Sequence, residues 1–437
     1  MEPDATAQDA RDAHDAHDAR EGHDAQTTCP RHRLDPLGGS PHTNNARWLT
    51  DGAAANVLMP GDVPGALVLG HAALKEFLAS PDVSKDPANF AEYQQGRVPD
   101  GWPLSGFTLN RSMLTADGTE HRRLRSAIGN TFTRGRIKAL RPTVEQLVDR
   151  LLDQMEHAAA ASADGVVDLR TQFALPLPLE VICELLGVPE AARARLHKIS
   201  SVLVNTDVPP AQVIAATQEM LAVLSGIVAD RTEQPQQDLI SDLTARAADP
   251  ALLSPEEVTG SLRSLFIAGH ETTMALLMNA VRALSAHPEA LDLVRHGKAT
   301  WAAVVEETLR WDGPVSYFPL RYPTKDLDVA GLRIEAGTAV LAGYSAAGRD
   351  PAAYGPDADR FDVTRDERVE LLAFGYGPHY CPGAPLARLE AEVALERLYA
   401  RFPELDLAVG EDQLEYSHTF VGNLVVELPV RLGAARR

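Results

Sequence analysis

The sequence predicts a mainly helical α+β fold with small β-sheets, in one large domain. Apolar residues recur at helical spacing over long stretches, whereas strand-like alternation is confined to four short pieces. No Gly/Ser-rich linker, internal repeat or clean boundary divides the 437 residues. One domain over residues 29–437 therefore fits better than the roughly three that length alone suggests.

The predicted elements follow from these two periodicities. Apolar residues at i, i+3, i+4 and i+7 predict helices over 137–158, 179–187, 211–230 and 386–402. Alternating apolar residues predict strands at 66–69, 327–334, 338–343 and 424–431.

One predicted helix is long enough to cross the molecule. Residues 254–257 form a capping box with proline at the first helical position, and the periodic pattern runs on to about Ala286. At ~1.5 Å per residue this helix spans on the order of 50 Å. Its middle, residues 268–273, reads Ala-Gly-His-Glu-Thr-Thr, and Gly and Thr are weak helix formers. A break in helix propensity inside a long buried helix indicates a functional position.

Composition excludes several classes of protein. The hydrophobic share of 45% is too high for general disorder, and the net charge of −20 argues against nucleic acid as a partner. No stretch approaches the ~18 apolar residues of a membrane span. Residues 1–28 are acidic, lack the apolar core of a signal peptide and are expected to be a disordered leader. The three cysteines, Cys29, Cys183 and Cys381, indicate a cytoplasmic protein without a disulfide framework.

Cys381 is the cysteine placed for chemistry. Residues 374–383 read Phe-Gly-Tyr-Gly-Pro-His-Tyr-Cys-Pro-Gly, and a helical run follows. A helix N-terminus favours a thiolate, and glycines let the backbone approach a flat ligand. The alternative is a buried structural cysteine, which is the interpretation we give to Cys183.

This loop matches the haem-binding signature F-G-x-G-x-H-x-C-x-G of the cytochromes P-450 at every fixed position. The chain resembles the soluble actinobacterial members over about residues 30–435. The resemblance implies the cytochrome P-450 fold enclosing haem b (iron protoporphyrin IX). It makes Cys381 the metal ligand and Phe374 the shield of its sulfur. Gly375 and Gly383 are expected to lie against the cofactor.

The resemblance assigns other residues to the cofactor and to catalysis. His121, Arg125, Arg321 and His379 match the residues that bind the haem propionates, for which arginine is suited because it binds carboxylates with two hydrogen bonds. Ala268 and Gly269 match positions over the haem, where the glycine would widen the helix groove. Glu271 and Thr272 match the acid–alcohol pair. Cleavage of the O–O bond needs two protons, which a carboxylate can relay through water and a hydroxyl.

Glu307 and Arg310 match the E-x-x-R motif of the family. They are spaced i, i+3 and so share one helix face. The motif also fits Glu120–Arg123 and Glu190–Arg193, and only the position about 70 residues before Cys381 selects this pair. The resemblance implies a structural role, as a buried ion pair that holds the loop under the haem.

The electrons are expected to come from ferredoxin and ferredoxin reductase, because the chain has no flavin or iron–sulfur signature. Residues 121–141 contain seven basic residues and no acid. We interpret this basic stretch as a dock for an acidic ferredoxin. The alternative is that several of these residues pair with acids elsewhere. The expected dock consists of Arg122, Arg123, Arg134, Arg136 and Lys138.

The resemblance implies a pocket for a hydrophobic small molecule, lined in part by Leu265, Val315, Phe318 and Phe420. The leading hypothesis is a monooxygenase that inserts one oxygen atom from O2 into a steroid, macrolide or other natural-product scaffold. A second hypothesis keeps the haem but couples aryl or indole rings without inserting oxygen. A third, a haem-binding sensor or carrier, predicts loss of the thiolate or of the acid–alcohol pair, and both are present.

Overall fold

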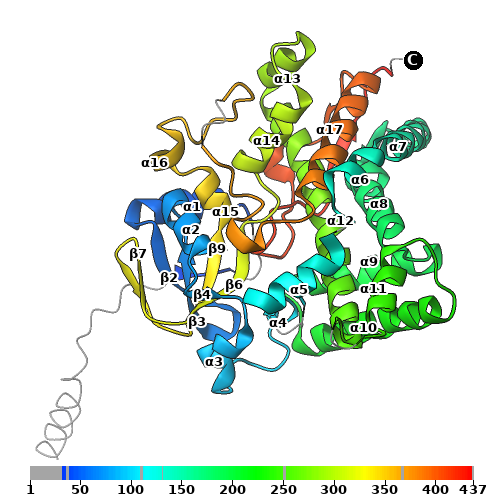
Figure 1. The fold of residues 1–437 in the computed structure, drawn as a ribbon. Coiled ribbons are helices and arrows are strands. Elements are labelled where there is room, and N and C mark those ends of the chain that lie inside the picture. The colour runs from blue at the N-terminus through cyan, green and yellow to red at the C-terminus, as the bar shows by residue number, and fades with distance from the viewer. Residues whose placement is uncertain are drawn as a thin grey trace, which may run out of the picture.

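The fold places a sheet layer on one side of the molecule and helices on the other (Figure 1). The long helix α12 (Pro255–Ala286) runs between them. This computed structural model describes residues 32–35, 39–108, 112–129, 131–249, 252–365 and 369–435. The predicted mainly helical α+β fold is confirmed; the acidic leader and Cys29 lie outside the described residues.

Helices make up most of the described chain. They are α1 (His42–Asp51), α2 (His71–Ala79), α3 (Ala91–Gln94), α4 (Ser105–Thr108), α5 (Gly118–Gly129), α6 (Arg134–Ala139), α7 (Arg141–Ala161), α8 (Pro176–Leu186), α9 (Glu190–Val204), α10 (Pro210–Glu233), α11 (Leu239–Arg246), α12, α13 (Pro288–Arg295), α14 (Trp301–Trp311), α15 (Tyr344–Gly348), α16 (Pro351–Tyr354) and α17 (Ala384–Arg401).

Three sheets accompany the helices. The largest has the strand order β1-β2-β3-β9-β6-β4, in which β3 pairs parallel with β9 and antiparallel with β2. A second sheet has the order β10-β11-β5, and β7 and β8 form a hairpin. The strands are β1 (His32–Arg33), β2 (Ala54–Met59), β3 (Val63–Val68), β4 (Val83–Ser84), β5 (Val166–Asp168), β6 (Tyr317–Pro323), β7 (Leu327–Val329), β8 (Leu332–Ile334), β9 (Ala339–Gly343), β10 (Asp406–Leu407) and β11 (Pro429–Arg431).

Most predicted elements are present, with three corrections. The helix predicted over 137–158 is two helices, α6 and α7, which meet at Leu140. Pro142 lies in the first turn of α7, where proline is tolerated, but it cannot continue a helix that started earlier. Of the strand predicted over 424–431, only Pro429–Arg431 is a strand. The strand predicted over 327–334 is a hairpin of two strands, β7 and β8, which turns at residues 330–331, where both φ angles are positive. The other predicted helices and strands overlap α8, α10, α17, β3 and β9.

The start of α12 is as predicted. The Ser254 hydroxyl accepts a hydrogen bond from the backbone N–H of Glu257, and the Glu257 carboxylate accepts one from the N–H of Ser254. Apolar residues such as Leu262 and Phe266 are buried over most of its length. A helix that is apolar on nearly every face is held in place on every side by packing. The middle of α12 is therefore a rigid support for a site.

Glu307 and Arg310 form the expected buried ion pair on α14. Both nitrogen-to-oxygen distances are 2.7 Å, and the two side chains are 5% and 4% exposed. Arg310 also donates to the carbonyls of Gly348, Ala358 and Arg360. The pair thus fastens residues 348–360 to α14, the stretch through which the chain approaches the cysteine loop.

Two features of the described residues pass a composition test for membrane spans. The helix α10 is long and apolar enough by itself, and the bent pair 170–186 and 190–204 passes when taken together. In the structure α10 packs against α9, α11 and α12, and it buries Val213, Met220 and Leu224.

Replacing Glu307 with alanine should lower the free energy of unfolding by about 3–5 kcal/mol, because Arg310 then keeps a buried charge without its partner. Urea unfolding followed by circular dichroism measures this change. The control is Asp292→Ala, which removes an exposed i, i+3 pair with Arg295 and should cost less than about 1 kcal/mol. Equal effects of the two substitutions would contradict the structural role of Glu307.

Candidate active site

Cys381 lies in a tightly turned loop just before α17. Its backbone N–H donates to the carbonyl of Phe374 at 2.9 Å, which closes the loop. Gly375 and Gly377 have φ angles of 76° and 73°, a region that favours glycine. A Cβ at Gly377 would also lie 3.1 Å from the carbonyl oxygen of Leu78. The glycines of the motif are therefore required by backbone conformation and by close packing.

Opposing effects act on the sulfur of Cys381. Burial raises the pKa of the thiol, whereas hydrogen bonds from the backbone N–H groups of Gly383 and Ala384 lower it. The positive charges of Arg125 and Arg388 also lower this pKa. The start of α17 thus supplies donors where a thiolate needs them. Cys183 is the contrasting case, because burial raises the pKa of its thiol to about 12.

A cavity of about 330 Å³ lies between the cysteine loop and α12. Its lining is mostly apolar, with a few polar side chains, as is usual for sites that bind small molecules. Most of the predicted site residues line it: His121, Arg125, Leu265, Ala268, Gly269, Glu271, Thr272, Val315, Phe318, Phe374, Gly375, His379, Cys381 and Gly383. The structure therefore brings together motifs that are up to 262 residues apart in sequence.

In the middle of α12, Gly269 and Thr272 line this cavity. Thr272 Oγ1 donates to the carbonyl of Ala268 at 2.7 Å, which leaves the lone pairs of the hydroxyl free for a partner in the cavity. A Cβ at Gly269 would lie 2.6 Å from Cγ1 of Ile182. The glycine is thus explained by the close approach of α8 and α12, in addition to the groove expected from the sequence.

Glu271 is held by hydrogen bonds from α9. Its carboxylate accepts from Ser200 Oγ at 3.1 Å and from Ser201 Oγ at 3.4 Å. Burial raises the pKa of this carboxyl, but hydrogen bonds from His270 and Ser200 and the charges of His270 and His197 bring the pKa below its ordinary value. Glu271 is therefore ionised at neutral pH. The sequence gave no indication of these partners on α9.

Histidine and arginine side chains gather at one end of the cavity. The rings of His121 and His379 are 4.2 Å apart, and Arg125 donates to the carbonyl of Tyr380 at 2.6 Å. Burial lowers the pKa of His379 to about 4, although a hydrogen bond with Asp117 acts in the opposite direction. Among the described residues, Nε2 of His121 is buried without a hydrogen-bond partner. An orphaned donor of this kind indicates a site for a bound anion.

Arg321 lies behind this end of the cavity and is not one of its lining residues. It is buried on β6 and hydrogen-bonds Tyr344, which does line the cavity. Its charge lowers the pKa of both His121 and His379. The structure thus groups Arg321 with the expected propionate-binding residues and adds Tyr344 to them.

Sequence reasoning missed Asp117 and Lys85. Asp117 accepts hydrogen bonds from the Ser84 hydroxyl and the Lys85 backbone N–H. These bonds and the one from His379 outweigh burial and lower the pKa of Asp117 to about 2. The Lys85 ammonium is buried and donates to the carbonyl of Pro319 at 3.2 Å. No sequence motif marks Asp117 or Lys85.

The prediction that Phe420 lines the pocket is wrong. Its side chain is buried in the core beside the sheet, whereas the neighbours Thr419 and Val421 line the cavity. Alternate side chains of an extended segment point to opposite sides. A sequence pattern cannot tell which of the two alternating sets faces the ligand.

The structure also corrects the expected dock. Arg123 donates to the buried carboxylate of Glu257 at 2.6 Å, and so it belongs to the cap of α12. Arg141, another member of the basic stretch, pairs with Glu145 and Glu392. The remaining residues of the predicted dock are exposed: Arg122, Arg134, Arg136 and Lys138.

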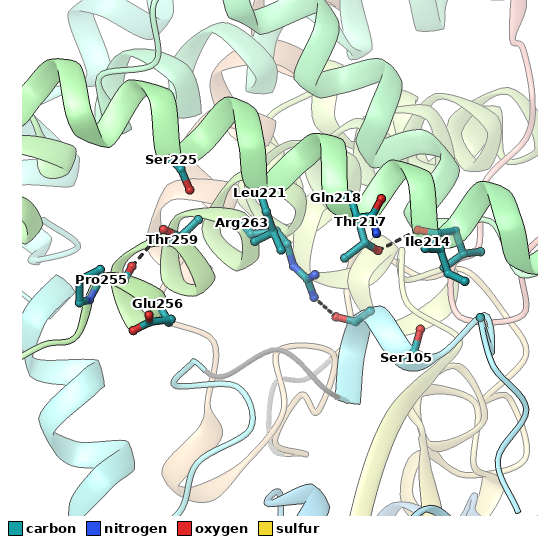
Figure 2. Close-up of a pocket in the computed structure, with 13 residues that line it drawn as sticks. Ser105, Ile214, Thr217, Gln218, Leu221, Ser225, Pro255, Glu256, Thr259 and Arg263 are labelled. Carbon is teal, nitrogen blue, oxygen red and sulfur yellow. Dashed lines mark hydrogen bonds between the residues drawn. The ribbon is translucent and has the colours of Figure 1, made fainter. Parts of the chain in front are cut away.

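A second, more open cleft of about 640 Å³ lies between α10, α12 and α4 (Figure 2). Arg263 reaches across it from α12 and donates to the carbonyl of Gly106. Both of these residues also line the first cavity. Arg263 and Gly106 therefore stand between the open cleft and the inner cavity.

Comparison with known proteins identifies the family. A family model described as cytochrome P450 matches residues 301–429. The chain is 35% identical over 405 residues to 2-hydroxy-5-methyl-1-naphthoate 7-hydroxylase of Streptomyces carzinostaticus, over 92% of this chain and 98% of that protein. The chain belongs to the cytochrome P450 family. It is also 37% identical to vitamin D(3) 25-hydroxylase of Pseudonocardia autotrophica, over 94% of this chain and 99% of that protein.

The fold of this P450 agrees with that assignment. The solved structure of CYP154C4 from Streptomyces sp. W2061 superposes with a TM-score of 0.89 at 39% identity. The match covers 93% of this chain and 99% of that one. The protein is therefore a P450 monooxygenase, an oxidoreductase that uses haem b, O2, a substrate and electrons from redox partners.

The residues of the inner cavity fit haem b. Cys381 lines the cavity and its sulfur would hold the haem iron, and glycine at 375 and 383 leaves room beside it. The orphaned Nε2 of His121, with Arg125 and His379, supplies donors for carboxylates at one end. When bound, haem b supplies the iron centre that activates O2.

Replacing Pro382 with leucine should raise the Fe(III)/Fe(II) potential. Proline has no N–H, so the sulfur receives backbone N–H groups from Gly383 and Ala384 but not from residue 382. An added hydrogen bond to the sulfur stabilises the reduced form, which is the more negatively charged one, by about 1 kcal/mol. For one electron this raises the potential by roughly 40 mV. Spectroelectrochemical titration measures the potential, and an unchanged or lower value would contradict the prediction.

Proposed function

We propose that this P450 hydroxylates a hydrophobic natural-product scaffold, such as a steroid, a macrolide or a fused aromatic acid. The observation that carries the proposal is the apolar lining of the inner cavity opposite Cys381, with Leu265, Val315 and Phe318 around the hydroxyl of Thr272. Two relatives are named as hydroxylases of a naphthoate and of vitamin D(3), both of which are largely apolar. The open cleft beside Arg263 offers such a molecule a route inward.

In this proposal Thr272 and Glu271 deliver protons during the reaction. The Thr272 hydroxyl faces the cavity and can accept a hydrogen bond there while it donates to Ala268. Glu271 is ionised and lies between the cavity and His197, whose side chain is 19% exposed. A carboxylate in this position can take up a proton from the side of α9 and pass it to water near Thr272.

We propose that electrons arrive from an acidic ferredoxin, served by a ferredoxin reductase, at the surface near Cys381. Arg125 on α5 contacts the backbone of Pro378 and Tyr380 in the cysteine loop. Arg122 precedes Arg125 by three residues and shares its helix face. The helix α6, which carries Arg134, Arg136 and Lys138, packs against α17. These contacts support a dock formed by the four exposed cations on α5 and α6.

We propose that residues 29–437 form the catalytic domain and that it acts in the cytoplasm. This proposal is supported by the residues that line the cavity or form the expected dock, which lie between 106 and 424.

Turnover with ¹⁸O2 tests the reaction class. The substrate is first chosen by its spin-state shift among naphthoates, secosteroids and macrolactones, and one labelled atom should enter the product. In Thr272→Ala, product formed per electron pair should fall at least tenfold, because proton delivery contributes about 10²–10⁴ to a rate. The control is Thr259→Ala on the same helix, whose hydroxyl makes the same type of bond, to Pro255.

Two results would contradict the proposal. A coupled product without labelled oxygen would favour aryl or indole coupling in its place. An equal loss of product in Thr272→Ala and Thr259→Ala would remove Thr272 from proton delivery.

Charge reversal tests the dock. In Arg122→Glu and Arg136→Glu, reduction by ferredoxin should slow at least tenfold at low salt, because opposite charges steer protein association. Turnover driven by hydrogen peroxide should stay unchanged. Stopped-flow absorbance measures the reduction, with Arg47→Glu on α1 as a control for charge reversal elsewhere. Equal losses with ferredoxin and with peroxide would mean that the substitutions disturb the haem site and not docking.

A further inference from the structure

Three metal-ligating side chains meet behind the inner cavity, at the crossing of α9 and α12. His197 comes from α9, and His270 and Glu271 come from α12. The Nδ1 atom of His197 lies 3.1 Å from Nε2 of His270 and 3.7 Å from Oε1 of Glu271. The distance from Nε2 of His270 to Oε1 of Glu271 is 3.3 Å.

These separations are those of ligands around one small ion. The point equidistant from the three atoms lies about 2.0 Å from each. Zn²⁺ binds histidine nitrogen at about 2.0–2.1 Å and carboxylate oxygen at about 2.0–2.2 Å. An ion slightly above the plane of the three atoms would meet both ranges. The side chains would need little movement to bind it.

A fourth polar atom lies next to two of these three ligand atoms. Ser200 Oγ lies 3.2 Å from Nε2 of His270 and 3.1 Å from Oε1 of Glu271. Either this hydroxyl or a water molecule in its place can complete four-fold coordination. Two histidines and a carboxylate with one exchangeable ligand form a donor set that zinc uses in proteins.

The ring of His270 is oriented for metal binding. Nδ1 of His270 lies 2.7 Å from the carbonyl of Phe266, which can only accept, so Nδ1 carries a proton and Nε2 is the nitrogen left for a metal. This second hydrogen bond also fixes the ring, as is usual for histidines that bind metals.

A metal ion can reach the three ligand atoms from solvent. The cluster itself contains no lysine or arginine that would neutralise the Glu271 carboxylate. The His197 side chain is 19% exposed, whereas His270 is fully buried. Among the described residues, Arg170, just before α8, is the charged group outside the cluster that acts on His197. An ion can thus enter past His197 and gain the carboxylate of Glu271 as its counter-charge.

We propose that His197, His270 and Glu271 bind one Zn²⁺ ion. Binding would take the Glu271 carboxylate away from proton transfer and would thereby inhibit the enzyme. This consequence rests on the role proposed for Glu271, whereas binding itself does not. Zinc should therefore slow ferredoxin-driven product formation at least tenfold and should affect peroxide-driven turnover less.

Zinc content after equilibrium dialysis tests the site directly. The full-length holoprotein should carry His14→Gln, His17→Gln and His23→Gln, so that the histidines of the leader do not contribute. We expect one Zn²⁺ per chain, and at least tenfold weaker binding in His197→Gln. The matched control is His296→Gln, an exposed histidine on the far end of the helical side, which should leave the zinc content unchanged. Mg²⁺, which prefers six oxygen ligands, should not compete.

Other outcomes overturn the proposal. Less than one zinc per chain, or equal zinc content in His197→Gln and the control, would mean that the cluster is a hydrogen-bond network only. If His197→Gln does not fold, Glu271→Gln serves as the second variant and should also lose zinc. If zinc binding is lost in His197→Gln but zinc does not slow ferredoxin-driven turnover of the wild type, the metal site is confirmed. The role of Glu271 in proton transfer is then contradicted.

Discussion

The structure depends on placing one sulfur atom, that of Cys381, at the floor of a buried cavity. Burial opposes the thiolate, and so the surroundings must supply compensation. It comes from the backbone N–H groups of Gly383 and Ala384 at the start of α17 and from the charges of Arg125 and Arg388. The tight glycine turns of the preceding loop make this geometry possible. Haem iron, when bound, would complete the balance, because a metal ion stabilises a deprotonated ligand.

The rest of the fold fixes the positions of the two faces of the cavity relative to each other. The helix α12 forms one face and is buried on almost every side. The cysteine loop forms the other, and residues 348–360 leading toward it are fastened to α14 by Glu307 and Arg310. Polar groups are confined to two places. The cations around His121 and Arg321 lie at one end, and Glu271 with its partners on α9 lies behind α12. This separation leaves the reacting centre apolar.

Sequence motifs were sufficient to predict those parts of the site whose residues lie close together in the sequence. The glycine-rich loop, the capping box of Ser254 and Glu257, and the i, i+3 pair on α14 each depend on residues close in sequence. The members of the acid–alcohol pair are adjacent in sequence, and the resemblance to the family selected them from many similar dipeptides. The partners of Glu271 on α9 could not be predicted, because they depend on how two helices cross.

The errors have the same cause. Phe420 and Val421 are both apolar, and only the packing of their extended segment decides which faces the cavity. Arg123 carries the same charge as Arg122, but tertiary structure places it beside Glu257. Pro142 was inside an apolar periodicity that continues across the break between α6 and α7. Periodicity reports which side of an element is apolar and does not report what that side contacts.

The central claim is that Cys381 binds the haem iron as a thiolate. The absorbance spectrum of the reduced carbon monoxide complex tests it most directly, with the full-length protein and the Cys381→His variant measured side by side. The account predicts a Soret band for the wild type that is strongly red-shifted from that of the histidine-ligated variant. A wild-type band at the position of the variant would contradict thiolate ligation, and with it the function that we assign to this cavity.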